Sequence, residues 1–283
     1  MLPNWIVLDD LLSRWLREDI GRGDQTTDGL AELTAVDGQA FWVAKEEGVI
    51  AGLPIAERVF SLLDIDVVFR RQVNEGDRIT SGTKIADIHC SLSTLLTGER
   101  VALNLAMRLS GIATMTRRYA DVIADLPTQL VDTRKTTPGL RILEKYAAAV
   151  GGAQNHRMGL DDGVMIKDNH IAAAGGIGPA VNAIRRHIPY PITIEVETEN
   201  LEQVNEAIAQ GADIIMLDNM SCETMSQAVN QIRTANDRIK IEASGNITLD
   251  TIRSVAETGV DYISSSAPIT RSSWLDLSMS IQT

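Results

Sequence analysis

The sequence predicts an α/β protein whose C-terminal part is a βα-barrel with fewer than the usual eight strands. From about residue 120 onward, short apolar runs alternate with helical patterns. The first 115 residues lack this alternation, and polar residues follow the ends of the predicted barrel strands. Alternating strands and helices are typical of parallel sheets, and polar strand ends are typical of barrel enzymes.

The predicted barrel rests on six apolar runs spaced about 20 to 35 residues apart. These strands are Gln129–Val131, Val164–Ile166, Ile192–Val196, Ile214–Leu217, Ile239–Ala243 and Tyr262–Ser264. The helices expected between them are Gly139–Val150, Pro179–His187, Leu201–Ala209, Glu223–Arg233 and Leu249–Glu257. In the first helix, Pro138 suits the start and Gly151-Gly152 the end.

The N-terminal part follows another pattern. WIVLDDLLSRWLRED predicts an amphipathic helix, and NEGDRITSGTKIADI predicts two strands joined by a turn. GERVALNLAMRLSGIATMTRRYADVIADL predicts a long helix whose centre, Ser110-Gly111, we take as a candidate domain boundary. We therefore expect an N-terminal α/β sandwich domain over 1–115 and the barrel over 116–273, with the segment from about 274 to 283 returning to the first domain.

Composition restricts the class of protein. The 283 residues are 44% hydrophobic and 23% charged, which favours a sizeable core. MLPNWIVLDD has no basic residue, so we expect no secretory signal, and no apolar run approaches the roughly 20 residues that span a bilayer. Cys90 and Cys222 lack metal-ligand spacing. We expect a soluble cytoplasmic protein, and the net charge of -12 argues against nucleic-acid binding.

One segment departs from this acidic character. From Arg134 to Lys167 there are six cations and three acids, so this segment carries +3 while the rest carries -15. Arg141 and Lys145 lie four apart on a predicted helix, where a solvated face is the simpler interpretation. The others adjoin strands or glycine loops, so they predict a site for an acidic small molecule.

Polar residues gather at the carboxyl ends of the predicted strands. Glu195 and Glu197 share one face of their strand, because residues two apart point the same way. Buried glutamates require cations or a metal. Arginine and lysine suit carboxylates and phosphates, and Glu197 with Asp218 suits Mg²⁺. The combination predicts a reaction between a phosphorylated sugar and an acid.

At these residues the sequence resembles the quinolinate phosphoribosyltransferase family. The resemblance is carried, in order, by LREDIGRGDQTT, GERVALNLAMRLSGIAT, DTRKTTPGLR, EKYA, NHRMGL, IKDNHI, IEVE, MLDNM and EASGNI. It implies transfer of a phosphoribosyl group from 5-phosphoribosyl-1-pyrophosphate to quinolinate, with release of pyrophosphate and CO₂. It also implies an N-terminal α/β sandwich, an incomplete barrel of about six to seven strands, Mg²⁺ as cofactor and a homodimer.

The resemblance also implies roles for individual residues. Lys135, Glu197 and Asp218 are expected to be catalytic, with the two acids near the metal, directly or through water. Arg100 is expected to reach the partner subunit's pocket. The remaining substrate-binding residues expected are Thr133, Arg134, His156, Arg157, Lys167, Ser244, Gly245, Asn246, Ser265, Ser266 and Ala267.

Two stretches depart from the family pattern, and three other functions remain open. Ala153-Gln154 replaces a glycine pair or Gly-His, and ISSSAPITRS has one extra residue with Ser266 at a usual glycine. The alternatives are another phosphoribosyltransferase of the same fold, a Schiff-base aldolase using Lys167, and a catalytically silent anion-binding protein.

Overall fold

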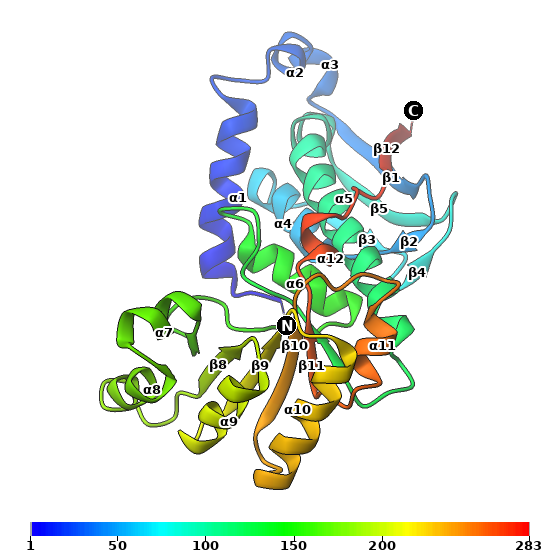
Figure 1. Ribbon diagram of the computed structural model, residues 1–283. Helices are drawn as coiled ribbons and strands as arrows, with labels where there is room; N and C mark the ends of the chain where they lie inside the picture. The colour runs from blue at the N-terminus through cyan, green and yellow to red at the C-terminus, as the bar shows by residue number, and fades with distance from the viewer. Residues whose placement is uncertain (1, 283) are drawn as a thin grey trace. The chain divides into compact units, whose positions relative to one another are not determined.

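The computed structural model describes residues 2–282 and divides into two compact units (Figure 1). The first unit takes in the chain up to residue 117, residues 142–151 and the chain from 272 onward. The second comprises 118–141 and 152–271. The expected boundaries near 115 and 273 lie close to these, but residues 142–151 group with the first unit.

The first unit is built on an antiparallel sheet with strand order β12-β1-β5-β3. Its strands are β1 (Asp37–Ala44), β3 (Val68–Arg71), β5 (Lys84–Ser91) and β12 (Leu277–Gln282), while β2 (Gly48–Val49) and β4 (Arg78–Ile79) form a separate pair. In β1 every second residue is buried, so one face of the sheet enters the core. There the ring of Trp42 meets those of Phe60 and Phe69 edge-on.

Helices complete the first unit. They are α1 (Trp5–Ile20), α2 (Gln25–Gly29), α3 (Ala31–Thr34), α4 (Leu53–Leu63), α5 (Leu92–Val122) and α6 (Arg141–Gly151). The end of α5, from residue 118, and the first residue of α6 are grouped with the second unit. Ser110-Gly111, the candidate boundary, lies inside α5 and within the first unit, whose first segment ends at residue 117 of the same helix. Gly111 instead permits close packing: a Cβ there would lie 1.9 Å from the Ser273 carbonyl oxygen.

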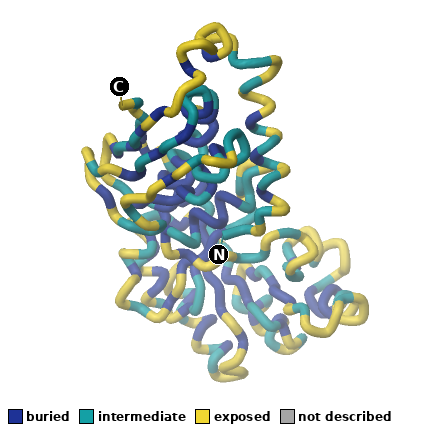
Figure 2. The backbone as a smooth tube through the Cα atoms, turned by 180° about the vertical axis from the view of Figure 1, so that it is seen from behind, coloured by how far each residue is buried: buried dark blue, intermediate teal, exposed yellow. Residues whose placement is uncertain are grey.

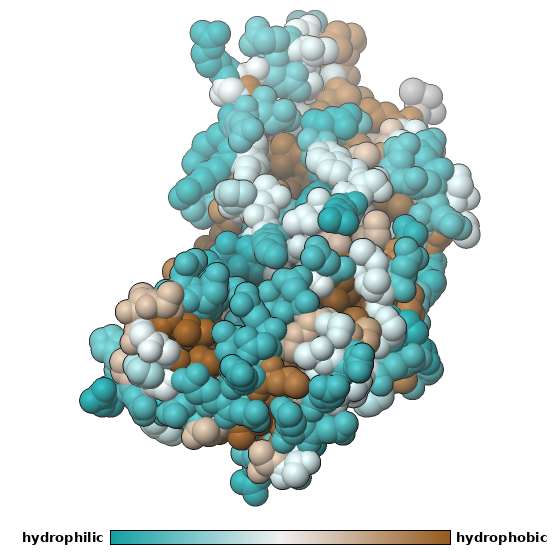
Figure 3. Space-filling view, in the orientation of Figure 1, coloured by the Kyte–Doolittle hydropathy of each residue, from teal (hydrophilic) through white to brown (hydrophobic). Residues whose placement is uncertain are grey.

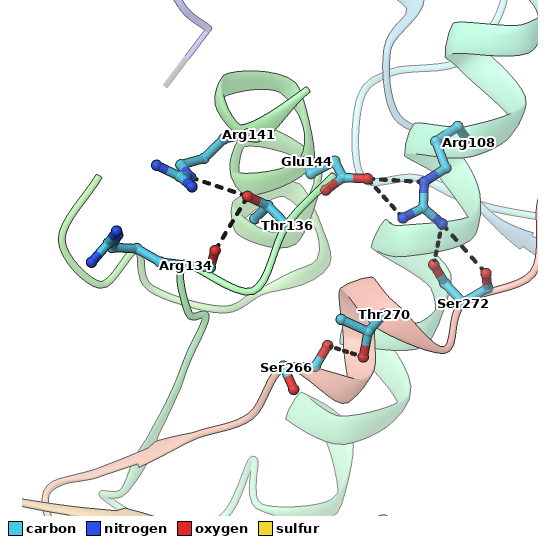
Figure 4. A network of polar contacts seen from close by, with 8 residues as sticks. All are labelled: Arg108, Arg134, Thr136, Arg141, Glu144, Ser266, Thr270 and Ser272. Atoms are coloured by element: carbon cyan, nitrogen blue, oxygen red, sulfur yellow. Dashed lines mark hydrogen bonds and ion pairs between the residues drawn. The ribbon is translucent and has the colours of Figure 1, made fainter. Parts of the chain in front are cut away.

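Buried polar groups of the first unit join α5, α6 and the C-terminal segment (Figure 4). Arg108 donates to Glu144 Oε1 at 2.7 and 3.1 Å and to Ser272 Oγ at 2.9 Å. Glu144 is fully buried. Arg108 is therefore not a free surface cation of α5, and we interpret it as part of the core of the first unit.

The second unit is an incomplete βα-barrel, which confirms the predicted fold class. Its parallel strands have the order β6-β11-β10-β9-β8-β7, and the sheet does not close between β7 and β6, although Val131 makes a bridge to Gln154. The strands are β6 (Gln129–Val131), β7 (Val164–Ile166), β8 (Ile194–Thr198), β9 (Ile214–Asp218), β10 (Lys240–Ser244) and β11 (Tyr262–Ser264).

The barrel helices lie outside the strands (Figure 1). They are α7 (Asp168–Ala174), α8 (Ile177–Arg185), α9 (Leu201–Ala209), α10 (Cys222–Ala235), α11 (Ile252–Ala256) and α12 (Ala267–Thr270). All six predicted strands are confirmed to within two residues at either end, whereas the short helices α7 and α12 were not predicted.

Burial follows this layering within the barrel. The strands run mostly dark blue in Figure 2, and the outer sides of the helices are exposed. Hydrophilic side chains cover much of the visible barrel surface, with smaller hydrophobic patches between them (Figure 3). No helix within residues 2–282 is both long and apolar enough to cross a membrane.

Candidate functional site

A cavity of about 480 Å³ opens at the carboxyl ends of the barrel strands. Alternate residues of each strand face it, as the pleat requires: Glu197 from β8, Met216 and Asp218 from β9, and Glu242 and Ser244 from β10. Loop residues after the strands complete the wall. The other lining residues are Thr133, Arg134, Lys135, His156, Arg157, Met165, Lys167, Asn219, Gly245, Asn246 and Ser264.

The loop after β6 presents two cations. Thr133 Oγ1 accepts from the Lys135 amide at 3.0 Å, and the Arg134 carbonyl accepts from the Thr136 amide at 3.0 Å. Arg141 Nε, at the start of α6, donates to Thr136 Oγ1 at 3.0 Å. Hydrogen bonds therefore join Arg134, Thr136 and Arg141 (Figure 4). Lys135 is exposed, and the Nε of Arg134 is buried without a hydrogen-bond partner among the described residues. The backbone of this loop is fixed while its cationic groups keep donors for a ligand.

The lysine after β7 is paired with a carboxylate. Lys167 Nζ lies 2.6 Å from Glu197 Oε2, and the Lys167 amide donates to His170 Nδ1 at 3.0 Å. Lys167 is also the N-cap of α7. The pair places a cation and an anion at one side of the cavity.

The ends of β9 and β10 carry a second group of polar residues. Asp218 Oδ2 accepts from Asn219 Nδ2 at 2.7 Å, and Asn219 Oδ1 accepts from Asn246 Nδ2 at 3.1 Å. Gly245 lies between Ser244 and Asn246 with a φ of 99°. A carboxylate and a glycine turn are thus adjacent, as binding of a metal and a phosphate would require.

His156 lies deeper, between two buried carboxylates. Its Nε2 is 3.1 Å from Glu195 Oε2 and 3.5 Å from Glu242 Oε2. Burial lowers the pKa of His156, but the hydrogen bonds to Glu195 and Glu242 outweigh it and raise the pKa to about 10. Nδ1 accepts from the Arg157 amide at 2.7 Å, a contact that must open when this nitrogen is protonated. Nε2 carries a proton in both forms.

The surroundings of this cluster explain its charge. Burial raises the pKa of Glu195, and the negative charge of Glu242 adds to this. Burial also lowers the pKa of Arg157, and the nearby Arg134 adds to that. Oε1 of Glu195 and Oε1 of Glu242 are both buried without a partner among the described residues. The interior therefore holds charge that the protein's own groups do not fully compensate.

A second cavity of about 420 Å³ lies toward the amino ends of the strands. It shares His156, Arg157 and Glu242 with the first cavity and is also lined by Glu195 and Lys240. Sequence reasoning missed Glu242 as a site residue. The signal was present, because Glu242 lies two positions before Ser244 and so faces the same side of β10.

Most predicted site residues line the first cavity. These are Thr133, Arg134, Lys135, His156, Arg157, Lys167, Glu197, Asp218, Ser244, Gly245 and Asn246. The predicted turn Ser265–Ala267 is not among the lining residues, and Ser264 takes its place. Ser265 is buried and its Oγ accepts from the Ala267 amide at 3.3 Å. Arg100 lies on α5 in the first unit, with 59% of its side chain exposed.

This arrangement can bind a molecule with several negative charges. The cations Arg134, Lys135 and Arg157 suit the carboxylates of a ligand. The acids Glu197 and Asp218 and the turn at Gly245 suit a metal-bound phosphate. Positioning and electrostatic stabilisation are the contributions that such a site makes to a group transfer.

Family models match both parts of the chain. The model described as the quinolinate phosphoribosyl transferase N-terminal domain matches residues 24–110, and the model for the C-terminal domain of the same family matches residues 112–280. Together the two models span most of the chain, including all the barrel strands.

Individual proteins agree with these models. The chain is 62% identical to a probable nicotinate-nucleotide pyrophosphorylase [carboxylating] from Synechocystis sp., over 99% of this chain and 94% of the relative. It is 46% identical to a protein of the same name from Bacillus subtilis, over 98% and 94%. The crystal structure of NadC from Streptococcus pyogenes superposes with a TM-score of 0.93 at 43% identity, covering 99% of this chain and 98% of that one.

Proposed function

Because the chain belongs to the quinolinate phosphoribosyl transferase family, we propose that the cavity at the carboxyl ends of its barrel strands is the active site. The enzyme transfers the phosphoribosyl group of 5-phosphoribosyl-1-pyrophosphate to quinolinate with decarboxylation, giving nicotinate mononucleotide, pyrophosphate and CO₂ in NAD biosynthesis. The observation that carries the proposal is the meeting of Lys135, Arg157 and Asp218 in one cavity.

The cationic side of the cavity suits quinolinate, which is a dianion. Arg134 and Arg157 offer planar donors to its carboxylates, and Lys135 adds a mobile point charge. The low pKa of Arg157 relative to free arginine reflects burial beside Arg134, so an anion between the two would relieve their repulsion. Thr133, His156 and Lys167 complete the quinolinate side in this proposal.

The reaction then depends on alignment. The ring nitrogen of quinolinate attacks the anomeric carbon while the bond to pyrophosphate breaks. The resulting pyridinium accepts the electron pair of the bond to the 2-carboxylate as CO₂ leaves, and the ring carbon takes up a proton. Fixed cations hold the ring carboxylates during both steps, so the protein's contribution is orientation and electrostatics.

The acidic side suits Mg²⁺ with the sugar pyrophosphate. Glu197 Oε2 accepts from Lys167 and Asp218 Oδ2 accepts from Asn219, and we assign the second oxygen of each carboxylate to the metal side. Hard oxygen ligands of this kind fit Mg²⁺, directly or through water. Bound there, Mg²⁺ would neutralise charge on the leaving pyrophosphate, while Ser244, Gly245 and Asn246 bind phosphate oxygens. Ser265, Ser266 and Ala267 remain a second proposed phosphate turn.

Release of labelled CO₂ tests the assignment. Quinolinate labelled in its 2-carboxylate is expected to release CO₂ only with 5-phosphoribosyl-1-pyrophosphate and Mg²⁺ present. Asp218→Asn is expected to raise the Mg²⁺ concentration needed for half-maximal rate. Full activity in excess chelator would contradict the metal proposal.

We further propose a homodimer in which Arg100 completes the partner subunit's site. The support is that Arg100 is exposed on α5 and that its contact with Glu99 is long, at 3.9 Å. Arg100→Ala and Lys135→Ala are each expected to be nearly inactive. Co-expression is expected to restore about a quarter of the wild-type rate, because half of randomly assorted dimers are mixed and hold one intact site. Equal inactivity of mixed and separate variants, with mixing shown by tagged pull-down, would contradict it.

An aldolase that forms a Schiff base is less well supported. Such an enzyme needs a lysine amine that is free to attack a carbonyl carbon, whereas Lys167 Nζ is hydrogen-bonded to Glu197 Oε2 at 2.6 Å. Borohydride trapping with carbonyl substrates is expected to label nothing. We also propose a cytoplasmic location, where the thiols of Cys90 and Cys222 would stay reduced.

A further inference from the structure

Asn219 has an uncommon backbone conformation directly after β9. Its φ is 53° and that of Asn246, after β10, is 51°; they are the two non-glycine residues with positive φ among the described residues. Asparagine tolerates this left-handed region better than most residues. Two such positions at neighbouring strand ends indicate a local arrangement that the rest of the structure maintains.

The side chain of Asn219 joins the two strand ends. Nδ2 donates to Asp218 Oδ2 at 2.7 Å, and Oδ1 accepts from Asn246 Nδ2 at 3.1 Å. The amide orientation follows from the partners, since a carboxylate only accepts and the Asn246 amide group donates. The Asn219 backbone amide also donates to the Ser244 carbonyl at 3.0 Å. Asp218 and Ser244 are paired in the parallel register, so these contacts extend the ladder past the strands.

Gly245 is shaped to this side chain. A Cβ on Gly245 would lie 2.2 Å from Asn219 Oδ1 and 2.8 Å from the Asn219 amide nitrogen. Glycine is therefore required at 245 by contact with Asn219 as well as by its φ of 99°. The turn at Ser244–Asn246 and the carboxylate of Asp218 are held by one residue.

We infer that Asn219 is a positioning residue that fixes the Asp218 carboxylate relative to the Ser244–Asn246 turn. The inference rests on the proposed function, in which Asp218 lies near Mg²⁺ and the turn binds phosphate. By donating to Oδ2, Asn219 leaves Oδ1 of Asp218 for the metal side. Metal and phosphate subsites then form one rigid unit that recognises the pyrophosphate of the sugar substrate as a whole.

Asn219→Gly tests this role, because glycine keeps the backbone conformation and removes both side-chain hydrogen bonds. The KM for 5-phosphoribosyl-1-pyrophosphate and the half-saturating Mg²⁺ concentration are each expected to rise about tenfold, which is the loss of one hydrogen bond to a charged group. The KM for quinolinate and the Tm are expected to stay near wild type. Calorimetric titration with the Mg²⁺ complex of the sugar pyrophosphate measures the same loss without turnover.

Two further variants make the test specific. Asn246→Gly removes the partner of Asn219 Oδ1 together with any contact of the Asn246 side chain with phosphate. In the double variant the two losses are expected to add to less than their sum, because the contact between Asn219 and Asn246 is shared. Asn219→Asp keeps the acceptor for Asn246 but replaces the donor to Asp218 by a carboxylate, and it is expected to alter the Mg²⁺ dependence while Tm is retained.

The outcomes separate this inference from the proposed site. If Asp218→Asn and Asn219→Gly both leave Mg²⁺ and sugar-pyrophosphate parameters unchanged, the proposed site is wrong and the inference falls with it. If Asp218→Asn impairs them and Asn219→Gly does not, the site stands and the inference alone is wrong. Equal changes in the KM of both substrates together with a lowered Tm in both Asn219 variants would indicate a general structural role and would also overturn it.

Discussion

Buried charge is handled differently in the two units. In the first unit, Glu144 accepts two hydrogen bonds from Arg108, and Glu75 accepts from the amides of Gly52 and Leu53 at 2.8 Å each and from Tyr146 Oη at 2.5 Å. Burial raises the pKa of Tyr146, and the neighbouring Glu75 adds to this, so the phenol remains a donor. In the barrel, Glu195 and Glu242 each keep one buried oxygen without a partner among the described residues.

The difference separates groups that hold the fold from groups that serve a ligand. A fully hydrogen-bonded carboxylate stabilises one arrangement of the helices and strands around it. A buried carboxylate with spare acceptor capacity costs stability, and proteins keep such groups mainly where they act on another molecule. The buried Glu144 and the half-buried Glu75 thus stabilise the fold of the first unit, whereas we infer that the spare oxygens of Glu195 and Glu242 are available to a ligand.

The largest expected effect is on turnover. Lys135→Ala removes an exposed cation of the cavity, so folding is expected to be unaffected. Loss of one preorganised charge in an active site lowers kcat/KM by about 10²–10³-fold. Steady-state kinetics with a melting curve measures both, and near-normal kcat/KM for quinolinate would show that the cavity is wrongly assigned.

A matched substitution in the first unit is expected to affect stability instead. Glu144→Gln leaves Arg108 half-buried without its carboxylate, which costs about 2–3 kcal/mol of unfolding free energy. Urea unfolding of the variant measures this. A loss below about 0.5 kcal/mol, the usual effect of a surface substitution, would show that the pair contributes little.

The charge of His156 predicts a pH dependence of stability. The folded protein holds this proton more tightly than the unfolded chain, since the pKa is raised from 6.5 to about 10. The contribution is therefore complete below pH 6.5 and is lost as pH rises through 10. Between these limits, at about 1.4 kcal/mol for each pKa unit, wild type is expected to lose about 4–5 kcal/mol more unfolding free energy than His156→Gln. Parallel stability curves for the two proteins would contradict the charged histidine.

The smallest expected effect is at Glu195. Glu195→Gln keeps an acceptor for His156 and removes one of two adjacent buried charges, so the unfolding free energy is expected to change by less than about 1 kcal/mol or to increase. Its contrast with Glu144→Gln is the direct test of the comparison. A loss at Glu195 as large as that at Glu144 would mean that both clusters are structural.

The strands were predictable because their signal is local. β6, β7 and β11 match the predicted ranges without change, since short apolar runs bounded by polar residues identify buried parallel strands. The long helix was predicted, but the extent of the first unit along it was harder to predict: Ser110 Oγ accepts from the Ala51 amide at 2.9 Å and Gly111 allows contact with Ser273. Both partners are distant in sequence. The assignment of α6 to the first unit depends on similar contacts, such as Tyr146 with Glu75.

The site was predictable where strand ends carry the residues. Lys135, Glu197 and Asp218 follow from the rule that parallel strands bring their carboxyl ends together. The pairing of Lys167 with Glu197 and the enclosure of His156 by two glutamates could not be predicted, because each depends on rotamers chosen across several strands. The role of Asn219 could not be predicted either, because the residue type alone does not determine whether φ is positive.

The return of β12 to the first sheet has a consequence for synthesis of the chain. β12 pairs along β1 from Ala44 with Leu277 to Gln39 with Gln282. On the ribosome, residues 118–271 of the barrel emerge before this strand does, although most of the first unit has already been made. The first unit therefore has an unpaired edge on β1 until β12 has been made, whereas the barrel needs no later segment of the chain. Released chains truncated after residue 272, which lack β12, should thus protect the barrel from protease better than they protect β1.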